Sequence, residues 1–208
     1  MRRGINNTMN MENLEQKNRE FFDKIAQYYD KRIFKNLLLN PVKNALEFVN
    51  IKENSKILDA GCGTGNLLML LSNKNKGLKL YGIDISKEMI KVARKKLKNA
   101  KIKLEAVERL NFKKDYFDYI FSIDAFHHYY NYDLVMKNFY RILKKDGYLI
   151  VVDFSFGVFF NRIFNKIEPG NNEMHTAPEF EGLFKEYKFK KIRQKRVGLF
   201  TILTIGRK

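Results

Sequence analysis

The chain has few of the residues that build metal clusters or cross-link small folds. One cysteine, Cys62, occurs among 208 residues, which excludes an internal disulfide framework, a cysteine-rich zinc or iron–sulfur site and radical chemistry on a three-cysteine cluster. Only three prolines are present, and this scarcity favours long regular helices and strands. The most apolar stretch, 148–160, is too short to span a bilayer and carries Asp153.

The N-terminal sixteen residues also lack the apolar centre of a secretory signal. These absences together predict a soluble, cytoplasmic protein without a transmembrane segment. Positive charge, in contrast, is abundant, since 40 Lys and Arg against 23 Asp and Glu give a formal net charge of +17. The lysines are spread over most segments, for example 91–103 and 185–196, which favours a solvated surface. Binding of nucleic acid, an anionic membrane or an acidic substrate stays open.

The hydrophobic pattern alternates between short apolar runs and helical spacing. Residues 1–12 are predicted to be a disordered tail, followed by a helix over 13–31 and a second helix that has Pro41 in its first turn. Predicted strands and helices then alternate, and the strands are at 55–60, 78–85, 101–107, 117–123 and 148–154. Nearly continuous apolar strands indicate a parallel sheet covered on both faces. Residues 190–208 are predicted to form a closing antiparallel pair, which completes one α/β domain.

A glycine-rich loop follows the first predicted strand. In ILDAGCGTGNL (57–67), Gly61, Gly63 and Gly65 have G-x-G-x-G spacing, unlike the G-x-G-x-x-G of dinucleotide binders. Ligands of open α/β sheets bind at the carboxyl ends of the strands, where this loop is expected to lie. Asp84 ends the second predicted strand, and its carboxylate can accept both ribose hydroxyls of an adenosine moiety. The order of strand, loop, helix, strand and acid predicts an adenosine-containing ligand.

These motifs carry a family resemblance. ILDAGCGTGNL with YGIDISKEMI (81–90) resembles the class I S-adenosylmethionine-dependent methyltransferases, and more narrowly the quinone-biosynthesis and small-molecule branch, methyltransferase domain type 11. Further matching segments are 21–30, 117–129, 141–154 and 179–194. The resemblance implies a Rossmann-like doubly wound α/β sheet, mostly parallel with a C-terminal antiparallel strand and helices on both faces. It implies a single methyltransferase domain over 13–208, with an N-terminal helical cap at 13–50 and an aromatic substrate-side insertion at 155–176.

The resemblance also implies S-adenosyl-L-methionine as the cofactor and a small-molecule methyl acceptor as the partner. Asp59 would help to place the methionine amino group, Ile85 would pack on the adenine, and the carbonyl near Ile123 would face the methionine amine. The cofactor-binding residues that it implies are Asp59, Gly61, Gly63, Gly65, Asp84, Ile85, Val107 and Ile123. Where the family often has an Asp for the adenine amino group, this chain has Ala106. Glu105 or Glu108 would substitute for it, or the backbone at Val107 alone would contact the ring.

Candidate catalytic residues follow the fourth predicted strand. His127 and His128, with Asp124, are expected near the transferred methyl group, where a histidine can act as a general base near neutral pH. Each histidine could instead shape the pocket or pack. Adjacent residues on a helix point about 100° apart, so no shared metal site is predicted. His175 could reach the same pocket, and Cys62 is predicted to be a packing residue.

The substrate side is predicted to combine the N-terminal helix, through Tyr28 and Tyr29, with the aromatic insertion. Phe156, Phe159, Phe160 and Phe164 would line an apolar pocket or cover the edge of the sheet. The favoured function is methyl transfer to oxygen, carbon or nitrogen of a small molecule, and an apolar pocket would suit an apolar or aromatic acceptor. The alternatives are a nucleic-acid-binding protein or RNA methyltransferase that uses the basic surface, and a non-catalytic cofactor-binding subunit. The sequence makes no prediction of the oligomeric state.

Overall fold

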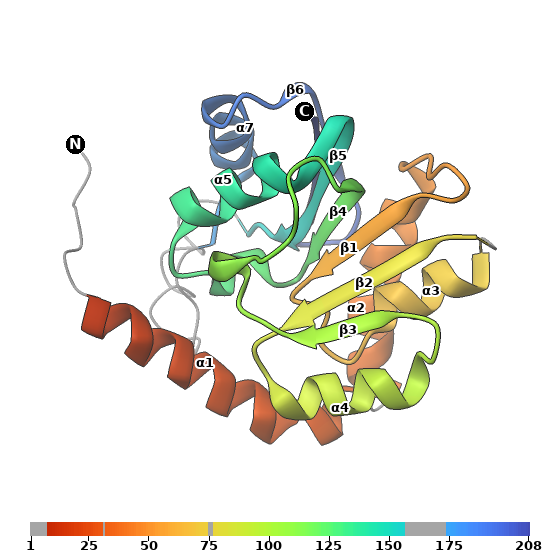
Figure 1. Cartoon of the computed structure of the whole chain (residues 1–208), viewed down its shortest axis with the longest axis vertical. Helices are drawn as coiled ribbons and strands as arrows, with labels where there is room; N and C mark the ends of the chain where they lie inside the picture. Colours follow the sequence, from red (N-terminus) through yellow and green to blue (C-terminus); the bar gives the residue numbers. More distant parts are fainter. Residues whose placement is uncertain (1–7, 31, 75–76, 157–173) are drawn as a thin grey trace.

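The computed structural model describes residues 8–30, 32–74, 77–156 and 174–208. A seven-stranded sheet with the order β3-β2-β1-β4-β5-β7-β6 forms its centre (Figure 1). The strands are β1 (Lys56–Ala60), β2 (Lys79–Asp84), β3 (Lys101–Leu104), β4 (Phe117–Ile123), β5 (Leu143–Phe154), β6 (Lys190–Arg196) and β7 (Thr201–Arg207). The first five strands pair in parallel, and β7 runs antiparallel between β5 and β6. The predicted mostly parallel sheet with a closing antiparallel pair is confirmed.

Helices cover both faces of this sheet, as predicted. They are α1 (Thr8–Tyr29), α2 (Arg32–Glu47), α3 (Asn66–Lys74), α4 (Lys87–Lys96), α5 (Tyr132–Ile142) and α7 (Ala177–Glu186), with 3-10 turns η1 (Val107–Arg109) and η2 (Phe126–His128). Two hydrophobic clusters correspond to the two faces: α5 and α7 pack into one, and α2, α3 and α4 pack into the other. Along β1, Leu58 belongs to the first cluster and Ile57 to the second, because successive strand residues point to opposite faces.

Helix boundaries differ from prediction at two places. The helix α1 begins at Thr8, inside the stretch 1–12 that was predicted as a tail. Pro41 lies in the interior of α2 rather than in its first turn. Beyond the end of α5 at Ile142, Asp146 takes the left-handed conformation, with a φ of 67°. An aspartate tolerates that conformation better than most residues.

The strand order reverses between β1 and β4, which are neighbours in the sheet although α3, β2, α4 and β3 separate them in the chain. The carboxyl ends of the two strands form the crevice where ligands of such sheets bind. Helix α1 passes along this edge of the sheet and packs on α4 (Figure 1). Phe159, Phe160 and Phe164 of the predicted aromatic insertion lie outside the described residues. Among the helices that the structure describes, none is both long and apolar enough to cross a membrane.

Candidate active site

The glycine loop is held against the end of β2 by backbone hydrogen bonds. The amides of Gly61 and Cys62 both donate to the carbonyl of Ile83, each at 2.9 Å, and the amide of Gly63 donates to Oδ2 of Asp84 at 2.8 Å. Gly61 and Gly63 have φ values of 74° and 49°, a conformation that favours glycine. A Cβ added to Gly61 would lie 2.7 Å from Cβ of Ala125, whereas one at Gly63 would meet nothing within 4 Å. The loop therefore presents bare backbone at Gly63 and packs tightly at Gly61.

Gly65 and Cys62 have mainly packing roles. A Cβ on Gly65 would lie 2.6 Å from Cδ1 of Leu97, so this glycine allows the loop to approach the end of α4. Gly65 is not among the residues that line the pocket described next, unlike the other two loop glycines. Cys62 is buried, and its burial raises the pKa of the thiol well above the ordinary value, which suits a packing residue and not a nucleophile.

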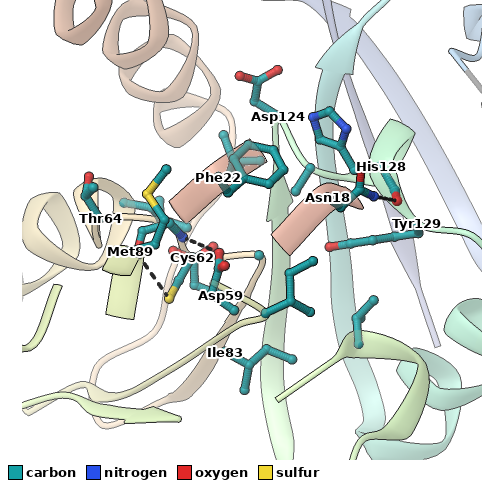
Figure 2. A pocket seen from close by; sticks show the side chains of 18 of the residues that line it. Asn18, Phe22, Asp59, Cys62, Thr64, Ile83, Met89, Asp124, His128 and Tyr129 are labelled. Atoms are coloured by element: carbon teal, nitrogen blue, oxygen red, sulfur yellow. Dashed lines mark hydrogen bonds between the residues drawn. The ribbon is translucent and has the colours of Figure 1, made fainter. Parts of the chain in front are cut away.

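A pocket opens between this loop, the ends of β1 and β4, and helix α1 (Figure 2). The predicted residues that line it are Asp59, Gly61, Gly63, Asp84, Ile85, Val107, Ile123 and His128. His127 is not a lining residue. The structure therefore brings most of the predicted cofactor residues together around one cavity.

Two buried carboxyl groups lie beneath the loop. Burial, with a contribution from the charge of Asp84, raises the pKa of Asp59 to about 8. Burial raises the pKa of Asp84 to about 6, although hydrogen bonds from the amides of Ser86 and Gly63 act in the opposite direction. The amide of Ser86 donates to Oδ1 of Asp84 at 2.8 Å. The floor of the pocket therefore holds two acids that a bound cation would stabilise in their charged form.

The region around Ala106, where the resemblance predicts an Asp that contacts the adenine, is acidic. Glu105, Val107 and Glu108 all line the pocket, and Ala106 is buried outside the lining. Oε1 of Glu105 accepts from the amide of Asn111 at 2.7 Å. Glu108 is 4% exposed, and burial raises its pKa to about 7. Each of the three predicted substitutes for the missing Asp therefore lies at the pocket wall.

Helix α1 forms the remaining wall and is fixed by polar contacts. Oδ1 of Asp23 accepts from Oγ of Ser86 at 2.6 Å and from the amide of Glu88 at 3.1 Å, so α1 caps the first turn of α4. Farther along the helix, Nδ2 of Asn18 donates to the carbonyl of His128 at 2.9 Å. Asn18 and Phe22 enter the pocket beside His128, across from Thr64 of the loop (Figure 2).

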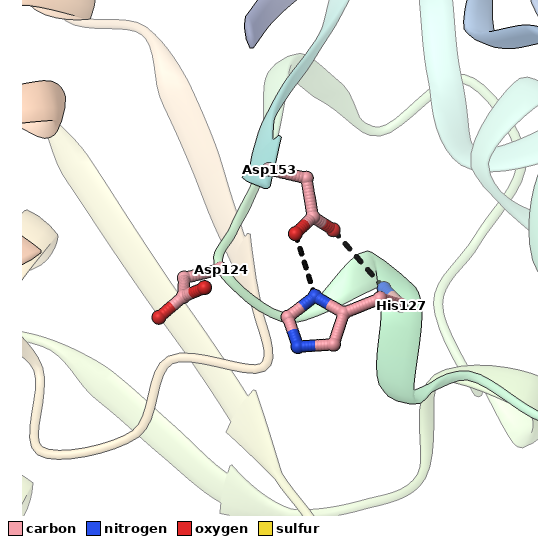
Figure 3. A group of neighbouring side chains, drawn as sticks. All are labelled: Asp124, His127 and Asp153. Atoms are coloured by element: carbon pink, nitrogen blue, oxygen red, sulfur yellow. Dashed lines mark hydrogen bonds and ion pairs between the residues drawn. The ribbon is translucent and has the colours of Figure 1, made fainter. Parts of the chain in front are cut away.

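The two predicted catalytic histidines have different surroundings. His127 is 2% exposed, and its Nδ1 lies 2.5 Å from Oδ1 of Asp153 at the end of β5, in a buried carboxylate–imidazole pair (Figure 3). Asp153 also accepts from the amides of His127 at 3.0 Å and Phe154 at 2.7 Å. The pKa of Asp153 stays below its ordinary value because these contacts, the His127 charge above all, outweigh the opposing effect of burial. His128 instead faces the pocket, and its ring contacts that of Phe22 edge to face with centroids 4.9 Å apart.

Asp124 stands at the end of β4 with a φ of 49° and lines the pocket. Possible metal ligand atoms of Asp124, His127 and Asp153 lie within 4.8 Å of one another (Figure 3). The 2.5 Å separation of His127 Nδ1 and Asp153 Oδ1 is that of a short hydrogen bond, since two ligands of one ion, each about 2.0–2.2 Å from it, lie farther apart. The rings of His127 and His128 lie closer than their helical spacing predicts, with centroids 3.9 Å apart.

Of the other residues predicted at the substrate side, some line the pocket and others lie outside it. Tyr29 lines the pocket, while Tyr28 is 45% exposed. His175 packs edge to face on Tyr132, with centroids 4.9 Å apart, and is not a lining residue. Phe156 stacks on Phe154 at 5.6 Å.

Sequence reasoning missed the polar residues of α1 and the partner of His127. Glu15, Asn18 and Phe22 line the pocket, and their spacing places them on one face of a helix. Polar residues on the buried stripe of a predicted amphipathic helix are the signal that marks them. Asp153, a lone acid within an apolar strand, was the corresponding signal in β5.

Comparisons with known proteins identify the family of the chain. A sequence model described as a methyltransferase domain matches residues 51–196. An uncharacterized protein of Methanocaldococcus jannaschii is 35% identical over 132 residues, which are 64% of this chain and 49% of that protein. The demethylmenaquinone methyltransferase of Thermotoga maritima is 29% identical over 142 residues, covering 64% of this chain and 59% of the enzyme. The chain thus spans about half to three fifths of the length of these relatives.

A solved structure supports the fold. The complex between the Haloferax volcanii Trm112 methyltransferase activator and a methyltransferase contains a chain that superposes with a TM-score of 0.81. The superposition covers 91% of this chain and 96% of that one at 18% sequence identity.

Proposed function

Because the chain belongs to the methyltransferase-domain family, we propose that it binds S-adenosylmethionine in the pocket of Figure 2 and transfers its methyl group to a small molecule. One observation carries the proposal: the amide of Gly63 donates to Asp84, so the bare loop and the ribose-binding acid form one unit. The acceptor and the full activity are part of the proposal, since the relatives are longer than this chain.

The residues around the pocket fit an adenosyl sulfonium. Asp84 accepts two backbone hydrogen bonds, and a carboxylate has about four lone-pair positions, which leaves capacity for a ribose diol. The open space beside Gly63 allows a ligand to lie against the main chain. Asp59, with its raised pKa, would receive the methionine ammonium and ionise beside it. Bound there, the sulfonium supplies an activated methyl group with a neutral thioether as the leaving group.

The chain's own residues would orient the acceptor and remove its proton. Phe22 and His128 approach the pocket from α1 and η2, on the side away from Thr64. His128 would take a proton from the acceptor, because a neutral imidazole has one ring nitrogen that can accept a proton. His127 would act indirectly, since its ring is held by Asp153 outside the pocket lining. Exclusion of water by α1 would favour transfer to the acceptor over hydrolysis.

The first experiment is thermal unfolding of the full chain with S-adenosylmethionine, S-adenosylhomocysteine or NADH. A ligand at 100 times its dissociation constant adds about 2.7 kcal/mol of stability, which is a measurable shift. We expect both adenosyl compounds to stabilise the wild type and NADH to have no effect. The variant Asp84→Ala should lose the stabilisation. If neither adenosyl compound stabilises the wild type, the proposal is wrong.

The charge of +17 keeps a nucleic-acid function as the second candidate. A nucleic-acid function predicts that the chain binds RNA and that its affinity for RNA falls steeply as the salt concentration rises. Titration of a labelled RNA at two salt concentrations tests it independently of the pocket. Strong salt-dependent binding together with methyl transfer to the RNA would replace the small-molecule acceptor by a nucleic acid.

A further inference from the structure

The charge of the pocket is opposite to that of the chain. Among the described residues that line it there is no lysine or arginine, although the chain has 40 of them. Its acidic lining residues are Glu15, Asp59, Asp84, Glu105, Glu108 and Asp124. Their charges also act on Tyr29 in the pocket wall. Burial makes the largest contribution to raising the pKa of its phenol well above the ordinary value, and the charges of Asp124 and Asp84 raise that pKa further. Positive ligands are therefore favoured in this cavity, and anionic ligands are disfavoured.

The sulfonium and ammonium of the proposed cofactor account for only part of this charge. Asp59 and Asp84 lie under the glycine loop, where the cofactor is proposed to bind. Oε1 of Glu15 accepts from Arg109 at 2.8 Å, which offsets its charge. Asp124 lies at the end of β4, near His128 and Phe22 rather than beside Thr64 (Figure 2). The carboxyl group of Asp124 thus lies on the side where the acceptor is proposed to enter.

Asn18 adds an observation that does not depend on charge. Its side chain is buried, lines the pocket and donates from Nδ2 to the carbonyl of His128. A carbonyl only accepts, so this bond fixes the orientation of the amide and directs Oδ1 elsewhere. Oδ1 of Asn18 is buried and has no hydrogen-bond partner. Buried polar atoms are rarely left in this state, so Oδ1 of Asn18 has the capacity to accept a hydrogen bond from a bound ligand.

We propose that the methyl acceptor is an amine that enters as an ammonium, donates an N–H to Oδ1 of Asn18 and faces the carboxylate of Asp124. The proposal rests on the function proposed above. The aromatic rings of Phe22 and Tyr29 provide faces on which a cation or an attached aromatic group can pack. A phosphomonoester acceptor is disfavoured by the acidic lining, and an uncharged quinol gains nothing from it.

The transfer balances as follows. The ammonium gives one proton to Asp124 or His128, which leaves a neutral nitrogen with a free electron pair. That nitrogen forms a bond to the methyl carbon as the carbon–sulfur bond of the sulfonium breaks, and the sulfur keeps the electron pair. The products are a methylated ammonium and a neutral thioether. Proton removal by a group beside Asn18 is required, because a protonated amine has no lone pair with which to attack.

The test is binding of matched ligands to the full chain saturated with S-adenosylhomocysteine. Calorimetric titrations at pH 7.5 use 2-phenylethylamine, 2-phenylethanol and phosphoethanolamine. We expect the amine to bind at least tenfold more tightly than the alcohol, and phosphoethanolamine to bind more weakly than the amine. Equal or tighter binding of the alcohol, or no binding of the amine, overturns the inference alone. Failure of S-adenosylhomocysteine to bind, measured first, overturns the proposed function and this inference with it.

Two variants test which residues produce the preference for the amine. Asn18→Leu should weaken the amine about tenfold or more, as expected for one hydrogen bond to a charged group, and leave the affinity for S-adenosylhomocysteine within about twofold. Gln16→Leu, on an exposed position of the same helix, is the matched control. Asp124→Asn keeps a residue that tolerates a positive φ and should reduce the preference for amine over alcohol. An equal loss of S-adenosylhomocysteine in Asn18→Leu would make Asn18 a cofactor ligand and refute its assignment to the acceptor.

Discussion

The buried acid Asp59 makes the stability of the ligand-free protein depend on pH in a direction that can be worked out. Asp59 lies in β1 with 2% of its surface exposed, and burial raises its pKa to about 8. In the unfolded chain an aspartate has a pKa of about 3.9. The folded protein therefore binds the proton more tightly than the unfolded chain does. Its contribution to stability is present at low pH and is lost as the pH rises from about 4 to about 8.

The magnitude follows from the two pKa values. Between pH 6 and about pH 8 the folded protein holds a proton on Asp59 that the unfolded chain has lost, so the free energy of unfolding falls by about 1.4 kcal/mol for each of about two pH units. Wild type should therefore lose about 3 kcal/mol of unfolding free energy from this group alone. The variant Asp59→Asn has nearly the same shape and no ionisable proton, so this part of the pH dependence should disappear. Asp84 and Glu108 titrate in both proteins and cancel in the comparison.

Urea denaturation of both proteins at pH 6 and pH 9 measures this difference directly. A parallel pH dependence in wild type and Asp59→Asn would refute the reasoning.

The carboxyl group of Asp59 also predicts how cofactor affinity changes with pH. If the methionine ammonium lies beside Asp59, binding releases its proton, and the affinity for S-adenosylhomocysteine should rise between pH 6 and pH 7.5. That rise should be absent in Asp59→Asn.

Two further outcomes are expected. Gly61→Ala should destabilise the fold by about 1–3 kcal/mol, because the new Cβ would lie 2.7 Å from Ala125 at a φ of 74°. Gly182→Ala is the control, since a Cβ at this position of helix α7 would meet nothing within 4 Å. This substitution should be neutral or stabilise the protein by up to about 1 kcal/mol. Thermal unfolding of the two variants measures the difference. His128→Gln should lower kcat by about 10²–10⁴ and leave the affinity for S-adenosylhomocysteine unchanged, if His128 is the base. An unchanged kcat, measured by transfer of a labelled methyl group, would remove it from that role.

The arrangement of the glycine loop and Asp84 was predictable because its parts are close in sequence and ordered by the sheet. Gly61, Gly63 and Asp84 follow two neighbouring parallel strands, and this local order alone predicts that they meet. The acceptor half depends on contacts between distant segments. Asn18 bonds to the backbone of His128, 110 residues away, and no local pattern predicts that register. Pro41 shows the same limit, since a first-turn preference was overridden inside α2.

The position of α1 links the two halves of the pocket. Asp23 caps helix α4, which starts just after Asp84, so this part of α1 is fixed to the side of the pocket where the cofactor is proposed to bind. Asn18 lies less than two turns earlier on the same helix and is fixed to η2 through His128. Loss of the Asp23 contacts would therefore act on the side of this wall next to α4, and loss of the Asn18 contact would act on the side next to η2. For this reason the choice of acceptor is expected to depend on α1, whose residues differ in kind from the glycines and the acid that are proposed to hold the cofactor.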